Sequence, residues 1–209
     1  MVTGVIEAFA ALLFIALATP SRLPPIEQCS SDSSFVQFRA KLLDVAVRKD
    51  EAALMDLLTD DVMIDLGGGQ GKAAFAATWG FGQAQPSTLW QELGVALKLG
   101  CAPAGDALVA PSLIVQFPDE LDAFETLVAL LGTKLRAAPD DRAAVVAALD
   151  WHVLSVVESV DVAPWSGVTL ADGRRGYVRG DQVRSPLDYR ASFEKRKGKW
   201  LLTSFIAGD

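Results

Sequence analysis

The sequence is poor in the residues that build most catalytic and metal centres. It has 1 histidine and 2 cysteines among 209 residues, so His152 has no second histidine as a partner. Nucleophilic triads and zinc centres draw on histidine and cysteine. We therefore predict no metal and no cofactor, and we expect His152 to be an ordinary turn or partly buried residue.

Basic residues are also scarce. The chain has 19 Lys and Arg against 26 Asp and Glu, a net charge of −7, which argues against nucleic acid as a partner. The charge is uneven, with a net charge of −9 over residues 1–126 and +2 over residues 127–209. Intrinsic disorder is excluded as the main state, because 51% of the residues are hydrophobic and the mean hydropathy is +0.28.

No apolar run reaches the length of a membrane-spanning helix. The longest, residues 8–18, has 11 apolar residues, whereas a span needs about 20. This length fits a signal peptide, and residues 16–18 supply the small-x-small cleavage pattern. We predict a signal peptide over residues 1–18, a periplasmic or secreted protein, and no stable span after cleavage. Because Glu7 replaces the usual positive charge, an uncleaved membrane anchor remains an alternative.

Residues 19–34 are rich in proline and serine, which indicates a linker. Cys29 lies in this segment, and the other cysteine is Cys101. In an oxidising compartment the two could form a disulfide bond, because export exposes thiols to oxidation. Two unrelated thiols are the alternative.

Residues 35–126 predict a helix-rich α+β module. Phe35, Phe38 and Leu42 recur at helical spacing, and Ser34 precedes them as a capping residue, so we expect a helix over 35–48. The remaining predicted elements are helices over 51–58, 72–79, 89–99 and 119–126, and strands over 62–66 and 107–117.

The densest carboxylates of this half are Asp60, Asp61 and Asp65. A catalytic acid–base pair needs two environments that separate the pKa values. These residues lie where a predicted helix ends and a strand begins, a position typical of solvated turn residues. A hydrolase or isomerase that uses Asp61 or Asp65 on a small ligand is our alternative function.

The order helix, helix, strand, glycine turn, helix over residues 35–79 resembles the start of nuclear-transport-factor-two-like cone folds. The tail, residues 189–209, resembles the last two strands of that fold, with a turn at Gly198. The resemblance implies that residues 187–209 complete the sheet of the first module around a small-ligand pocket. Alternatively, this terminal hairpin belongs to the second module.

The second half has short β-type runs separated by turn signals, which favours a small barrel or sandwich. One of these signals, Asp172-Gly173, predicts a tight hairpin turn. Residues 165–173, Trp-Ser-Gly-Val-Thr-Leu-Ala-Asp-Gly, are similar to the Trp-x-x-Val-x-x-x-Asp-Gly pattern of bacterial SH3-like domains. Residues 176–178, Gly-Tyr-Val, and residues 135–139, Leu-Arg-Ala-Ala-Pro, also resemble this family. The resemblance implies an SH3-like barrel over 127–186, a domain common on exported and cell-envelope proteins.

The predicted fold is therefore α+β, with a helix-rich module, an SH3-like barrel and a terminal β-hairpin. The resemblance points to a non-enzymatic protein that binds peptidoglycan, a peptide or an envelope protein. The candidate contacts are Trp165, Tyr177, Arg174 and Arg175. The alternative is that the two aromatic residues close a small core and that the arginines form a solvated strand face.

Overall fold

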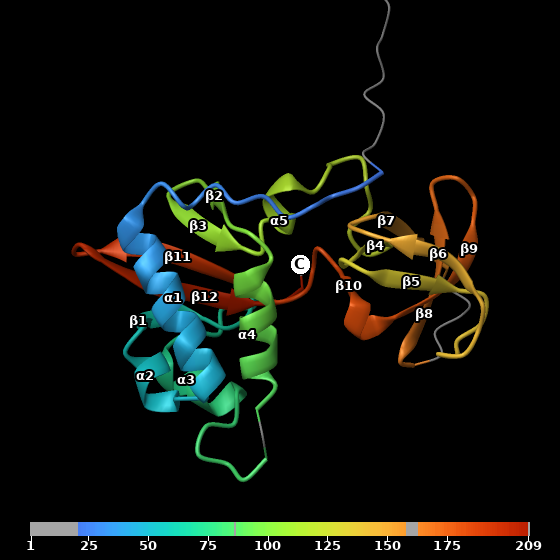
Figure 1. Cartoon of the computed structure of the whole chain (residues 1–209). Coiled ribbons are helices and arrows are strands. Elements are labelled where there is room, and N and C mark those ends of the chain that lie inside the picture. Colours follow the sequence, from blue (N-terminus) through green and yellow to red (C-terminus); the bar gives the residue numbers. More distant parts are fainter. Residues whose placement is uncertain (1–20, 86, 158–162, 209) are drawn as a thin grey trace, which may run out of the picture.

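The computed structural model describes residues 21–85, 87–157 and 163–208. These residues form a module of helices packed on a sheet and, beside it, a module of strands (Figure 1). The α+β class is therefore confirmed at this coarse level. Within the described part of the chain, no helix is long and apolar enough to span a membrane. The predicted signal peptide lies outside the described residues.

The first module, which we call the α/β module, contains the helices. They are α1 (Ser33–Arg48), α2 (Glu51–Met55), α3 (Lys72–Thr78), α4 (Leu89–Lys98) and α5 (Leu113–Gln116). The predicted long helix is present as α1, with Phe35 and Phe38 on its buried face. Its capping residue is Asp32 rather than Ser34, because the Asp32 carboxylate accepts the backbone N–H of Ser34 at 2.8 Å.

Strands from both ends of the chain make the sheet of the α/β module. They are β1 (Leu58–Met63), β2 (Ala102–Ala104), β3 (Ala107–Ala110), β11 (Arg190–Arg196) and β12 (Lys199–Ile206), in the order β1-β12-β11-β3-β2. β12 is parallel to β1, and the other pairs are antiparallel. The β11–β12 hairpin turns at Lys197 and Gly198, with φ of 51° and 79°. It occupies the middle of this sheet.

Aromatic rings fill the space between these helices and the sheet. Phe193 of β11 lies 5.3 Å from Phe35 and 5.8 Å from Phe38, measured between ring centroids. Further ring contacts join Trp79, Tyr189 and Phe205. Close-packed rings of this kind bury a large apolar area, so the packing of α1 on the hairpin holds the module together.

Two predicted elements are wrong. The strand expected over residues 107–117 ends at Ala110, and the chain continues into α5. Pro111 has no N–H to donate to the ladder, which explains this end. Residues 119–126 form no helix, and Thr126 instead begins a strand of the second module.

The second module, which we call the β module, is one sheet of seven strands. They are β4 (Thr126–Ala129), β5 (Thr133–Arg136), β6 (Val145–Leu149), β7 (Val153–Val156), β8 (Trp165–Leu170), β9 (Arg175–Arg179) and β10 (Val183–Arg184). The strand order is β10-β4-β7-β8-β9-β5-β6, with β10 and β6 at the edges. The described residues therefore show an open sheet, and the closed SH3-like barrel is not shown. The expected hairpin turn is present, with Gly173 at φ 85° between β8 and β9.

Residues 21–29, which we call the strap, run along both modules (Figure 1). The Leu23 N–H donates to the Trp151 carbonyl of the β module at 2.8 Å, and the Cys101 N–H of the α/β module donates to the Ile26 carbonyl at 2.9 Å. The segment whose composition indicated a linker is thus hydrogen-bonded to both modules.

A buried arginine joins the modules a second time. The Arg184 guanidinium of β10 lies 2.9 Å from a Glu92 carboxylate oxygen of α4 and 3.2 Å from one of Asp188. It also donates to the Tyr189 carbonyl at 3.0 Å. Burial raises the pKa of Asp188.

Candidate functional site

The β8–β9 hairpin places two of the four predicted contact residues, Arg175 and Tyr177, on one face of β9. Alternate residues of a strand share a face, so Arg175, Tyr177 and Arg179 point to the same side of β9. Tyr177 pairs across the sheet with Gly167, and Arg179 pairs with Trp165. Cationic and aromatic side chains therefore alternate along this face.

A groove of 340 Å³ opens beside Tyr177 and Arg175. Its other lining residues are Ala137, Val157, Gly167, Val168 and Gly176. Gly167, directly opposite Tyr177, has no side chain to fill the groove. Gly176 is required for packing, since a Cβ there would lie 2.4 Å from the Arg136 carbonyl of β5. The groove combines an aromatic ring, a cation and small apolar residues.

Arg175 differs from the neighbouring arginines in its partners. It is exposed, and within the described ranges it forms no ion pair. Arg174 pairs with Asp172 at 2.7 Å inside the hairpin turn, and this pair lowers the pKa of the Asp172 carboxyl. Arg179 is held by Asp181 at 2.9 Å. Of these cations, Arg175 is the one available to a ligand of the groove.

Trp165 does not offer a stacking surface, which corrects the expectation. Its side chain is 6% exposed, and the Arg179 guanidinium lies 5.9 Å from its ring centroid. The sequence pattern could not show that Arg179 lies over this ring. Of the four predicted contacts, Tyr177 and Arg175 line the groove, whereas Trp165 is buried and Arg174 belongs to the turn.

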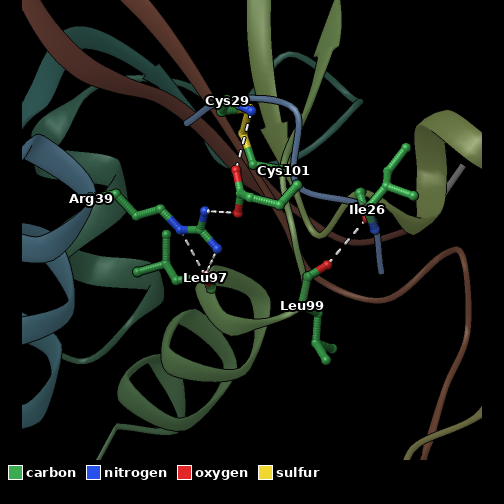
Figure 2. The surroundings of a disulfide bond; sticks show 8 residues. Ile26, Cys29, Arg39, Leu97, Leu99 and Cys101 are labelled. Atoms are coloured by element: carbon green, nitrogen blue, oxygen red, sulfur yellow. Dashed lines mark hydrogen bonds and ion pairs between the residues drawn. A yellow bond between two sulfur atoms is a disulfide. The ribbon is translucent and has the colours of Figure 1, made fainter. Parts of the chain in front are cut away.

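Cys29 and Cys101 form a disulfide bond between the strap and the start of β2, with 5.7 Å between their Cα atoms. Figure 2 shows Arg39 of α1 directed toward the Leu97 carbonyl at the end of α4. The same guanidinium pairs with Glu27 of the strap, which also accepts the Cys29 N–H at 3.1 Å. This network fixes the strap against both helices.

A carboxylate and two sulfur atoms lie close together at this disulfide. The Glu27 oxygen and the sulfurs of Cys29 and Cys101 lie within 4.8 Å of one another. Zinc and similar ions bind thiolates, whereas these sulfurs are bonded to each other. The oxidised pair therefore serves as a covalent link.

The carboxylates of the alternative function lie at the surface. Asp61 is 57% exposed and accepts two hydrogen bonds from Arg196, at 2.8 and 3.0 Å. These hydrogen bonds lower the pKa of Asp61, whereas a general acid needs a raised pKa. Asp65 accepts the Gly69 N–H at 2.8 Å in a turn. Neither arrangement favours acid–base chemistry.

His152 has a local structural role. Its Nδ1 accepts the backbone N–H of Asp150 at 3.0 Å, and burial lowers its pKa. Arg22 of the strap forms a β-bridge with this residue.

Sequence reasoning did not find the groove as a whole. Val157 and Ala137 come from segments far from β9 in the sequence, and small apolar residues carry no functional signature. The usable signal was a glycine opposite an aromatic residue in a predicted hairpin. The register that pairs Gly167 with Tyr177 follows from the Asp172–Gly173 turn.

No protein-family model matches the chain, and no curated protein matches it. The solved structures that are similar to it include the following two. One, named Rd1NTF2_05 with a set of substitutions, is 13% identical at a TM-score of 0.32, covering 85% of this chain and 99% of its own. The other, an NTF2-like protein of unknown function from Pseudomonas putida, is 11% identical at a TM-score of 0.31, covering 85% and 84%. Both names match the cone-fold resemblance of residues 35–79 and 189–209, and likeness at this level carries nothing about function.

Proposed function

We propose that this chain is an exported, non-enzymatic binding protein of the cell envelope whose β module holds a carboxylate-bearing chain. The observation that carries the proposal is the convergence of Arg175 and Tyr177 on one 340 Å³ groove. A groove of this size falls in the range of small-ligand sites, about 300–1,000 Å³. In the envelope, the peptides of peptidoglycan supply such carboxylates. The SH3-like resemblance of this module is consistent with such a role and remains a prediction.

Two kinds of contact support the choice of ligand. A guanidinium donates two parallel hydrogen bonds to a carboxylate, which gives both affinity and orientation. A tyrosine ring offers an apolar face to a peptide or sugar, and its hydroxyl can donate a hydrogen bond. Arg175 and Tyr177 are two residues apart on β9, so one ligand can reach both.

Export is supported by two independent features. The apolar run of residues 8–18 fits a signal peptide, and the Cys29–Cys101 disulfide is typical of an oxidising compartment. Both features support export, and an exported chain would carry the groove to where envelope polymers are present.

The test is co-sedimentation of the purified protein with peptidoglycan sacculi, paired with fluorescence anisotropy of a labelled acidic peptide. Arg175→Gln and Tyr177→Ala each remove one groove contact. Arg174→Gln is the matched control, because it removes the same charge from the adjacent residue, which pairs with Asp172.

We expect Arg175→Gln to weaken binding about tenfold, the worth of one charge-assisted contact, and Arg174→Gln to change it less than about twofold. If the intact protein binds neither the sacculi nor the peptide, the proposal is wrong. Equal losses in the two arginine variants would also overturn it, because binding would then follow net charge. If the protein binds the peptide but not the sacculi, the ligand is a protein or peptide rather than peptidoglycan.

A further inference from the structure

Helix α1 carries a second apolar stripe on the side that faces solvent. The stripe consists of Val36, Ala40, Leu43 and Val47. Val36 is 46% exposed and Val47 is 75% exposed, and a contiguous exposed apolar patch, unlike a single exposed residue, indicates an interaction surface. The spacings of four, three and four residues alternate as those between the a and d positions of a seam between paired helices do.

A groove runs along each side of this stripe. The first, of 340 Å³, lies between the strap and α1 and is lined by Val36, Ala40 and Leu43. The second, of 260 Å³, lies between α1 and α4 and is lined by Leu43, Val47 and Gly94. A Cβ built on Gly94 meets no atom within 4 Å, so side chains of a docked helix have room there.

We propose that the stripe is the docking surface for a second copy of this chain, with the two α1 helices antiparallel. This inference concerns the α/β module and is independent of the binding proposed for the β module. A two-fold axis near residues 41 and 42 places Val36 against Val47 of the second copy, and Ala40 against Leu43 of the second copy. The stripe is therefore complementary to itself.

Side-chain volume favours the antiparallel arrangement. In a parallel pair, Ala40 would face Ala40 of the second copy and leave space between the helices, which costs packing energy. In the antiparallel pair, the small Ala40 faces the large Leu43 in two equivalent layers. Small residues also let helix backbones approach closely, and the open Gly94 position receives the end of the seam.

Charge along the stripe agrees with this arrangement. Gln37 and Asp44 lie on the same flank of the seam. Asp44 pairs with Arg48 of its own helix at 2.9 Å, and the Gln37 amide of the other copy can donate to its second carboxylate oxygen. Arg39, on the opposite flank, is already engaged by Glu27 and the Leu97 carbonyl.

The experiment is sedimentation velocity of the full chain over a wide concentration range. We expect a reversible dimer. Val47→Glu buries an unpaired charge in the seam and should raise the dimer dissociation constant at least about a hundredfold. Leu131→Glu is the matched control, since Leu131 is 71% exposed and lies in the β module. It should leave the dissociation constant unchanged. Circular dichroism melts establish that each variant is folded.

Crosslinking determines the direction of the helices. A mixture of Val36→Cys and Val47→Cys chains should form a thiol-crosslinked dimer, whereas each variant alone should not. Self-crosslinking of the Val36→Cys chain alone would overturn the antiparallel pairing. A wild-type chain that stays monomeric at every concentration, or a folded Val47→Glu chain that dimerises as well as wild type, would overturn the proposal.

Discussion

The two modules bury different kinds of side chain, and the difference bears on the proposed ligand site. In the α/β module, aromatic rings such as Phe35, Trp79 and Phe205 fill the space between helices and sheet. The β module has an aliphatic core that includes Leu135, Leu149 and Val178. Its tyrosine lies on the outer face, beside the groove. The resemblance to cone folds suggested a site inside the first module, whereas the geometry favours the surface of the second.

The largest expected effect tests the aromatic core. Phe193→Ala removes a fully buried ring that contacts Phe35 and Phe38, so we expect the free energy of unfolding to fall by about 3–5 kcal/mol. Urea denaturation followed by tryptophan fluorescence measures the loss. A fall of less than about 1 kcal/mol would show that the ring cluster is not what stabilises this module.

The next effect concerns the covalent link between strap and sheet. Cys29→Ala combined with Cys101→Ala opens a loop with a sequence separation of 72 residues. We expect a loss of about 2–4 kcal/mol, because the unfolded chain regains entropy. Thermal melts without reductant provide the comparison. If the wild-type protein melts at the same temperature as the double variant, the disulfide does not hold the strap.

A smaller effect concerns the junction of the modules. Arg184→Gln leaves Glu92 and Asp188 without their cation, and both carboxylates are partly exposed, so we expect a loss of about 1–3 kcal/mol. Limited proteolysis should cut the chain between β10 and β11 faster than in wild type. Unchanged proteolysis and stability would mean that the strap alone joins the modules.

The smallest effect is a dependence on pH. The Ser34 hydroxyl and backbone N–H groups lower the pKa of Asp32 to about 2. A carboxyl with a lowered folded pKa stabilises the fold above its unfolded pKa, near 3.9, and this contribution is lost as the pH falls through the folded value. Asp32→Asn does not titrate. The difference in urea midpoint between wild type and Asp32→Asn should therefore shrink between about pH 4 and pH 2, and a constant difference would contradict this cause.

Local signals in the sequence predicted local structure well. Helical spacing predicted α1, and the Asp172–Gly173 and Lys197–Gly198 pairs predicted hairpin turns, because each depends on neighbouring residues. The prediction of Ser34 as the capping residue was wrong, because Asp32 and Ser34 both suit the start of a helix. Only the folded backbone shows which of the two side chains accepts the first N–H groups.

Contacts between distant segments could not be predicted in the same way. Trp165 is buried, and the Arg179 guanidinium that lies over its ring also pairs with Asp141, which is 38 residues away in the sequence. The open sheet of the β module likewise depends on which strands lie beside β5, and these strands are distant from one another in the sequence. The resemblance implied a closed barrel, whereas the register leaves β6 at an edge.

The central claim is that the groove of the β module, rather than the interior of the α/β module, receives the ligand. The most direct measurement is a titration of the isotope-labelled protein with an acidic peptide, followed by backbone amide chemical shifts. The account predicts saturable shifts at Gly167, Gly176 and Tyr177, and in Arg175→Gln the same shifts should need about tenfold more peptide to saturate. Shifts centred on the strands and helices of the α/β module, with β8 and β9 unchanged, would contradict it.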